Sequence, residues 1–247
     1  MAIFHFEAQI IARAGGRRGR SRSVIAAAAY RAAEQLYDQR LGLTFDYRNK
    51  RGVTHQEILA PAGTAKWLGN RETLWNHVER LEKRRDAQLA RELNIALPHE
   101  LDAEQRLRLI RDFVLAEFVA RGMVADLTLH DPVEGESDAR HFHAHVLLTL
   151  REAHGGGLSR VKTRGWNSNA LLLRWREQWA LHANRALALA GSEARIDHRC
   201  LLAQRDDAIR RGDEPAARAS TVCRKLPWGL RRSRAMCGAS NIRLETK

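Results

Sequence analysis

Stretches in which apolar and polar residues alternate predict the strands of this protein. Such alternation runs over residues 4–10, 89–97, 125–130 and 141–150. Because successive side chains of a strand point to opposite faces, each stretch would have one buried side and one polar side. The last two stretches are joined by the glycine-containing segment 131–140, so we expect them to pair as antiparallel neighbours.

Stretches with helical spacing separate the predicted strands. We expect helices from Ser21 or Ser23 to about Asp38, over 67–85, over 101–121, over 169–190 and over 200–211. The segments LTFDYR (43–48) and THQEILA (54–60) flank the turn-like NKRGV and predict a hairpin. This order of elements indicates an α+β fold in which helices pack on one face of an antiparallel sheet and the other, polar face is left open.

The charge balance favours a polyanionic partner. The 247 residues include 42 Lys and Arg against 29 Asp and Glu, for a formal net charge of +13 and an isoelectric point near 10.7. Such an excess points to nucleic acid, with a membrane surface as the weaker alternative. No apolar run approaches the roughly 20 residues of a spanning helix, and the N-terminus lacks the pattern of a signal peptide. We therefore expect a cytoplasmic protein without membrane insertion.

A glycine- and arginine-rich segment, RAGGRRGRSR (13–22), comes directly before the first predicted helix. Its arginines are Arg13, Arg17, Arg18, Arg20 and Arg22. Backbone N–H groups and guanidinium groups in such a loop can both follow a phosphate chain. A solvated, flexible loop is the alternative, but the position of the segment favours DNA binding.

Histidines recur at every second position in RHFHAHVLLTL, as His141, His143 and His145, and His130 closes the preceding predicted strand. If the two strands pair, all four lie on one polar face. Three imidazoles from adjacent strands can hold a divalent ion and leave its other positions free for water or substrate. A solvated sheet face is the alternative. The cysteines are widely spaced, so a metal would need histidine, and periodicity does not decide which two of the three clustered histidines ligate.

A metal-binding histidine usually shares its second nitrogen with a carboxylate. Glu7, Glu92 and Asp126 are candidates, because each falls on the polar side of its predicted strand. Glu92 is the best placed, next to Arg91 in a strand otherwise committed to the core. For Asp126 an ordinary surface charge is an equal alternative.

Tyr30 lies among small residues in IAAAAYRA. A core aromatic packed on alanines is the simplest interpretation. The functional interpretation is a nucleophile, because small neighbours leave room for a phosphodiester and a phenolate can form a covalent phosphotyrosine. A divalent ion on the phosphate oxygens would offset the charge that develops.

Seven blocks occur in a characteristic order: FHFEAQIIAR, SVIAAAAYRA, LWNHVERLEKRRDAQLARELNIALPHEL, DLTLHDP, HFHAHVLLT, RGWNSNALLLRWREQWALHANRAL and IDHRCLLAQ. In these blocks the chain resembles the MobA/MobL family of plasmid mobilisation relaxases, which are single-tyrosine HUH endonucleases. The resemblance covers most of residues 1–212. The H-x-H motif alone is moderately specific, whereas the ordered set is highly specific. The resemblance implies an HUH relaxase-like fold with a ferredoxin-like, split βαβ core.

The resemblance also implies a reaction. Family members nick one DNA strand at a transfer origin, keep its 5′ end as a phosphotyrosine and accompany it through a type IV secretion channel. Tyr30 resembles the nucleophile, His143 and His145 resemble the H-x-H pair, and His130 resembles the third ligand. Glu92 resembles the acidic residue of the site, with its role as base, histidine partner or ligand left open.

The family's metal is usually Mg²⁺ or Mn²⁺, although three histidines would also take zinc or other transition ions. The implied partners are single-stranded or supercoiled DNA at a transfer origin, accessory mobilisation proteins and a type IV coupling protein. The implied location is the bacterial cytoplasm, with export alongside the DNA. His141 departs from the family, since relatives usually carry another residue there, and this leaves it open as an alternative ligand.

We expect a relaxase domain over residues 1–212 and a basic tail over 213–247. The tail carries eight basic and three acidic residues and does not resemble the family's usual continuation. A divergent end, a disordered DNA-binding arm and an altered reading frame are all compatible with it.

Other function classes are compatible with parts of the pattern. A replication initiator or transposase would use the same HUH chemistry, but the ordered blocks favour a relaxase. A three-histidine metallohydrolase acting on a small molecule would leave Tyr30 as mere packing, and the basic loop argues against it. A non-catalytic DNA-binding protein would place histidines against phosphates and would keep its activity without a metal.

Overall fold

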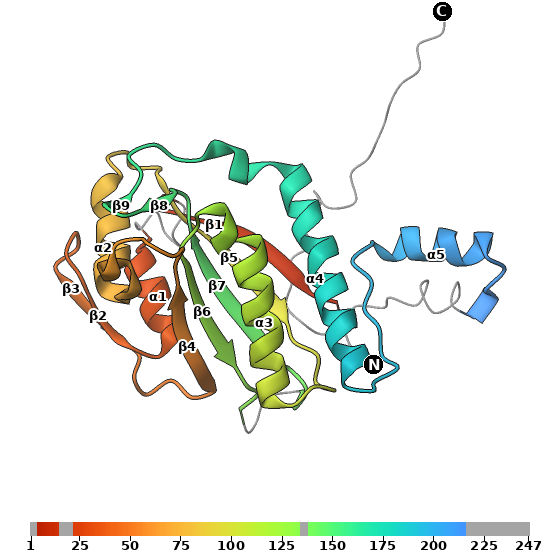
Figure 1. Ribbon diagram of the computed structural model, residues 1–247. Helices are drawn as coiled ribbons and strands as arrows, with labels where there is room; N and C mark the ends of the chain where they lie inside the picture. Colours follow the sequence, from red (N-terminus) through yellow and green to blue (C-terminus); the bar gives the residue numbers. More distant parts are fainter. Residues whose placement is uncertain (1–3, 15–21, 134–137, 216–247) are drawn as a thin grey trace, which may run out of the picture. The chain divides into compact units, whose positions relative to one another are not determined.

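The computed structural model describes residues 4–14, 22–133 and 138–215. The chain divides into two units, residues 1–196 and 197–247. The first contains the sheet (Figure 1), and the second contains α5 (Leu201–Arg210). Nearly all of the predicted basic tail lies outside the described residues. Among the described helices, none combines the length and apolar character needed to cross a membrane.

A five-stranded antiparallel sheet forms the centre of the first unit. Its strands, in spatial order, are β1 (Phe6–Ala12), β5 (Gln88–Ala96), β7 (His143–Thr149), β6 (Ala125–His130) and β4 (Val53–Leu59). The predicted pairing of β6 with β7 is confirmed, and its register places His130 directly opposite His143. The last histidine of one strand therefore meets the first of the next.

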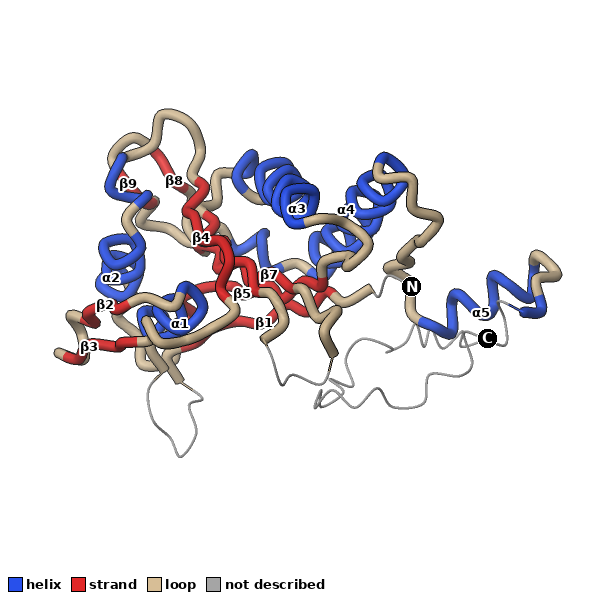
Figure 2. The backbone as a smooth tube through the Cα atoms, turned by 90° about the horizontal axis from the view of Figure 1, so that it is seen from below, coloured by secondary structure: helices blue, strands red, loops and turns tan. Residues whose placement is uncertain are grey.

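Two long helices cover one face of the sheet. These are α3 (Ala103–Glu117) and α4 (Asn169–Leu189), which lie side by side on the same side of the sheet (Figures 1 and 2). A capping box starts α3, with Asp102 and Gln105 each bonding the other's backbone N–H. Fully buried aromatic residues from both helices pack on the inward side chains of the strands, among them Phe113 and Trp175. The predicted α+β class with an antiparallel sheet is confirmed.

The opposite face, which we expected to be open, is open only in part. Two further helices, α1 (Val24–Ala32) and α2 (Arg71–Leu81), pack there in a second apolar cluster that includes Leu147. The reason lies in β7. Its polar face begins with His143 and His145, but the next residue on that face is Leu147. The apolar end of the face is covered by helices, and the histidine end keeps its polar character.

The region between α1 and β4 differs from the prediction. The first helix does not reach Asp38 but ends at Ala32, followed by Ala33 in the left-handed conformation with φ of 53°. The chain then returns as β2 (Gln35–Asp38), which pairs with β3 (Leu43–Asp46) in a separate small sheet. It does so because Leu36 is buried in the cluster beneath α1.

The predicted hairpin of 43–48 with 54–60 is therefore wrong. β4 pairs instead with β6 at the edge of the main sheet. Its apolar residues explain this choice, since Leu59 packs in one core cluster and Ile58 against the other. The remaining short elements are η2 (Lys66–Gly69), η3 (Val119–Arg121), β8 (Ala153–His154), β9 (Gly157–Leu158) and η4 (Arg164–Asn167).

Candidate active site

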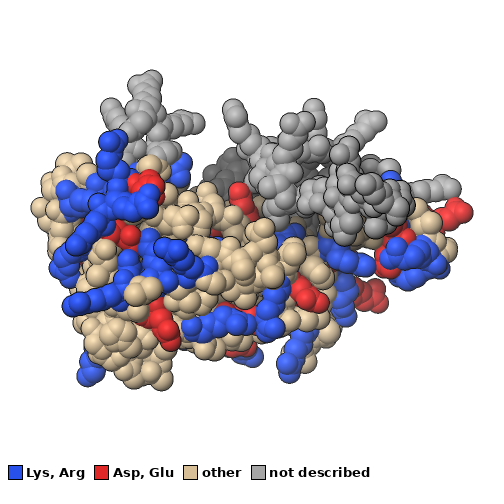
Figure 3. Space-filling model, turned by 90° about the horizontal axis from the view of Figure 1, so that it is seen from above, with Lys and Arg blue, Asp and Glu red and all other residues tan. Residues whose placement is uncertain are grey.

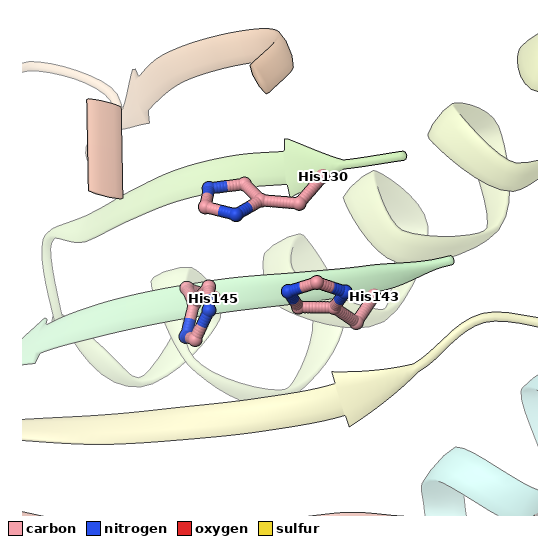
Figure 4. A group of neighbouring side chains, drawn as sticks. All are labelled: His130, His143 and His145. Atoms are coloured by element: carbon pink, nitrogen blue, oxygen red, sulfur yellow. The ribbon is translucent and has the colours of Figure 1, made fainter. Parts of the chain in front are cut away.

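Three histidines converge at the polar end of this face of the sheet. His130 comes from the end of β6, and His143 and His145 come from one face of β7 (Figure 4). Each offers one ring nitrogen, and the three nitrogens lie within 4.8 Å of one another. The fourth predicted histidine, His141, lies outside this group, and its ring stacks on that of His143 with centroids 4.5 Å apart.

Backbone carbonyl groups fix the orientation of two of the three rings. His130 Nε2 lies 2.8 Å from the carbonyl oxygen of Arg31, and His143 Nδ1 lies 3.1 Å from that of His141. A carbonyl oxygen only accepts hydrogen bonds, so these nitrogens carry the protons. The lone pairs are left on His130 Nδ1 and His143 Nε2. This is the arrangement that metal-binding histidines require.

A carboxylate orients the third ring. His145 Nδ1 lies 3.1 Å from Glu92 Oε1, which also accepts from Arg31 Nε, while Glu92 Oε2 accepts from Gln9 Nε2 at 2.6 Å. Burial alone would raise the pKa of Glu92, but the hydrogen bond from His145 and the charge and hydrogen bond of Arg31 lower it to about 2. A carboxylate this acidic is a weak base. The geometry favours Glu92 as the partner of His145.

The three rings are neutral at physiological pH. Burial is the largest cause that lowers their pKa values, to about 3 for His130 and about 4 for His143, and the pKa of His145 is lowered as well. The nearby charge of Lys50 acts in the same direction. Neutral imidazoles keep the lone pairs that a metal ion needs, so the donor set fits a divalent ion of intermediate softness.

The depressed pKa values predict how stability depends on pH. In the unfolded chain histidines take up protons near pH 6.5, whereas folded His130 and His143 resist protonation down to about pH 3 and 4. Between these limits the unfolded state binds more protons, so the free energy of unfolding falls as pH falls from about 6.5 towards 4. Urea denaturation of the metal-free protein at pH 7, 6, 5 and 4.5 measures this. In His143→Gln the free energy of unfolding should depend less steeply on pH. An unchanged pH dependence would contradict the lowered pKa of His143.

Tyr30 lies on α1 and is 49% exposed, which does not fit the interpretation as a core aromatic. Its ring contacts that of Tyr47 edge-on at 5.2 Å, and Lys50 Nζ lies over it, 4.0 Å from the ring centroid. The same ammonium is 3.4 Å from His130 Nδ1. The following residue, Arg31, is the one whose carbonyl group binds His130. Tyr30 therefore lies beside the histidine cluster.

Lys50 also belongs to this candidate site, although no pattern in the sequence predicts it. Burial, followed by the charge of Arg31, lowers its pKa to about 8. In the sequence it stands in NKRGV, which reads as an ordinary polar turn. Only the folding of this segment against α1 reveals its position.

Two of the predicted carboxylates contact residues outside the group of His130, His143 and His145. Asp126 is 2% exposed and accepts hydrogen bonds from Arg71 Nε at 3.0 Å and from Trp75 Nε1 at 2.8 Å. It holds α2 against the sheet, which accounts for its place on the polar face. Glu7 is exposed, and its nearest ion-pair partner is His5 at 4.0 Å.

The predicted DNA-binding arginines have different surroundings. Arg13 is directed inward, where it bonds Glu79 Oε2 at 2.7 Å and the carbonyl group of Arg84, so it has a structural role. Arg22 is exposed just before α1. Arg17, Arg18 and Arg20 lie outside the described residues. Lys and Arg side chains are spread over the face shown in Figure 3, with Asp and Glu among them.

Comparison with known proteins matches residues 22–213 to the MobA/MobL family. The conjugal transfer protein TraA of Agrobacterium fabrum is 36% identical over 229 residues, which cover 81% of this chain and 20% of TraA. The mobilization protein MobL of Acidithiobacillus ferridurans is 36% identical over 227 residues, which cover 81% of this chain and 58% of MobL. The chain thus spans about a fifth of TraA and less than two thirds of MobL.

A solved structure shares the fold. It was described under the heading "Molecular Basis of Vancomycin Resistance Transfer in Staphylococcus aureus" and is 30% identical to this chain. The alignment covers 80% of this chain and 99% of the other, with a TM-score of 0.67. The likeness therefore extends to nearly the whole of that structure.

Proposed function

Because this chain belongs to the MobA/MobL family, we propose that it is a relaxase that nicks one DNA strand at a plasmid transfer origin. One observation carries the proposal: an exposed tyrosine lies beside three converging imidazoles. Tyr30 immediately precedes Arg31, whose carbonyl group binds His130, and Lys50 contacts both Tyr30 and His130. A nucleophile and a set of metal ligands are thus held by the same few residues.

In the proposed reaction the hydroxyl oxygen of Tyr30 attacks the scissile phosphorus. The new P–O bond to tyrosine forms as the P–O3′ bond breaks, and the electron pair of that bond leaves with O3′. The phenolic proton passes to solvent and O3′ takes up a proton, so the products are a 5′-phosphotyrosine and a free 3′-hydroxyl. A divalent ion held by His130, His143 and His145 would polarise the non-bridging oxygens of the phosphate.

The residues around the ligands have supporting roles in this proposal. Glu92 fixes the tautomer of His145 and stays ionised, and Arg31 holds Glu92. Arg22, which is exposed just before α1, remains a proposed DNA contact. Arg13 is no longer proposed to bind DNA, because its guanidinium group pairs with Glu79.

The wider biology is part of the same proposal. The metal is Mg²⁺ or Mn²⁺ by family resemblance, while an all-imidazole set also suits other transition ions. The substrate is single-stranded or supercoiled DNA at a transfer origin, and the partners are accessory mobilisation proteins and a type IV coupling protein. The protein acts in the bacterial cytoplasm and is exported with the DNA.

The test uses a library of single-stranded oligonucleotides incubated with the protein and Mn²⁺, followed by a denaturing gel. Strands labelled at the 3′ end should migrate with the protein, whereas strands labelled at the 5′ end should only become shorter. EDTA should prevent both changes. Attachment of the 5′-labelled fragment to the protein would contradict the proposed 5′-phosphotyrosine linkage. An adduct that forms equally well in EDTA would contradict the proposed metal site.

A further inference from the structure

Lys50 has a position that its sequence context does not predict. It lies in the connection between β3 and β4, yet its ammonium group reaches both the Tyr30 ring, at 4.0 Å, and His130 Nδ1, at 3.4 Å. These two residues come from different elements, α1 and β6. Lys50 is thus the side chain that joins the proposed nucleophile to a proposed metal ligand.

The charge of Lys50 is not neutralised by the described residues around it. In the part of the chain that the structure describes, no carboxylate forms an ion pair with it, and its neighbouring charge is the cation Arg31. Arg31 itself is paired with Glu92. A partly buried ammonium group without an acidic partner is costly unless an anion binds there. An anion beside Tyr30 is what the proposed substrate would provide.

The contact with His130 has a second consequence. Because Nε2 of His130 donates to Arg31, the only lone pair of the ring is on Nδ1, where Lys50 donates. A single lone pair cannot bind an ammonium proton and a metal ion at the same time. An ammonium group and a metal ion at the same nitrogen would also repel each other. Lys50 and the metal ion are therefore alternative partners of the same nitrogen.

We propose that Lys50 binds the phosphate that Tyr30 attacks, and that it hydrogen-bonds His130 only while no metal ion is present. This inference rests on the proposed function. With a metal ion at the histidines, the flexible lysine stem can turn its ammonium group from Nδ1 to a non-bridging phosphate oxygen beside the Tyr30 ring. There it would offset negative charge in the transition state.

The test is Lys50→Met, which keeps an unbranched apolar stem and removes the charge. Two measurements should change in opposite directions. Calorimetric titration with Mn²⁺ in the absence of DNA should show about tenfold tighter binding, because the competing hydrogen bond is gone. The rate of covalent adduct formation at saturating Mn²⁺ should fall at least about tenfold. A misfolded variant would instead bind Mn²⁺ more weakly and also form the adduct more slowly.

Arg48→Met is the matched control, because it removes a charge from the same connection at a residue paired with exposed Asp46. Its Mn²⁺ affinity and adduct rate should match the wild type. Unchanged or weaker Mn²⁺ binding in Lys50→Met would overturn the proposed competition between Lys50 and the metal ion for His130 Nδ1. An unchanged adduct rate would overturn the proposed contact between Lys50 and the phosphate. If neither wild type nor Lys50→Met binds Mn²⁺, this proposal and the proposed metal site both fail. If the wild type binds Mn²⁺ and forms the adduct, the proposed function stands whatever Lys50→Met does.

Discussion

Tyr30→Phe is expected to abolish covalent attachment of DNA, lowering the adduct rate by at least about a thousandfold, because removal of a nucleophile removes the covalent route itself. The aromatic ring would stay, and with it the edge contact with Tyr47 and the position of Lys50 above the ring. Mn²⁺ binding and thermal stability should therefore match the wild type. The measurement is the rate at which 3′-labelled strand becomes bound to protein on a denaturing gel.

The other tyrosines provide the controls. Tyr37 is 44% exposed on β2 and has no part in the proposed site, so Tyr37→Phe should react at the wild-type rate. Tyr47 adjoins Tyr30, and it is the residue to which the reaction would be reassigned if Tyr30→Phe still formed the adduct and Tyr47→Phe did not. Adduct formation by both Tyr30→Phe and Tyr47→Phe would exclude each of these two tyrosines as the sole nucleophile.

The second large effect concerns folding. Asp126→Ala should lower the free energy of unfolding by about 3–5 kcal/mol, because it leaves the buried guanidinium of Arg71 without its main carboxylate partner and Trp75 Nε1 without an acceptor. Chemical denaturation of the metal-free protein measures the loss. Part of the Arg71 contacts would persist, through Glu34 at 2.5 Å and Gln56 at 3.0 Å.

A matched control shows whether removal of any carboxylate has the same effect on stability. Asp46 pairs with Arg48 on the surface, where solvent screens the interaction, so Asp46→Ala should leave the denaturation midpoint unchanged. A midpoint of Asp126→Ala equal to that of Asp46→Ala would show that the Arg71 contacts contribute nothing to stability. The denaturation midpoint of Asp126→Asn, which keeps an acceptor for Trp75, should lie between those of Asp126→Ala and Asp46→Ala.

Alternation along the chain was sufficient to predict the histidine face. The pleat alone decides that His143 and His145 point the same way, and the antiparallel pairing of β6 with β7 brings His130 next to them. The α+β class could be predicted from the same pattern. The coverage of the second face could not, because the run that follows the histidines, LLTL, does not show whether Leu147 faces solvent or a helix.

The contacts around the site were less predictable, because they depend on tertiary packing. Alternation marks Glu92 as a candidate histidine partner but does not show which histidine it contacts. Glu92 and His145 are 53 residues apart in the chain, and the pairing of β5 with β7 places them together. Asp126 lies on the polar side of its predicted strand, where a histidine partner would also lie. Its partner is instead Arg71, which belongs to α2 and precedes it by 55 residues. Lys50 depends on how one loop folds, and no periodicity describes that.

The two faces of β7 restrict how this site can change. Ala144, Val146 and Leu148 are fully buried on the face opposite to the histidines, so a one-residue slip of the strand would place imidazoles in the core and aliphatic side chains at the ligand positions. Two residues along a strand span about 6.8 Å, and that spacing between His143 and His145 is therefore inherited from the pleat. His130 is not tied to them in this way, since it belongs to another strand. Substitutions that alter the choice of metal should therefore accumulate around β6 and the Arg31 carbonyl group, and not within β7.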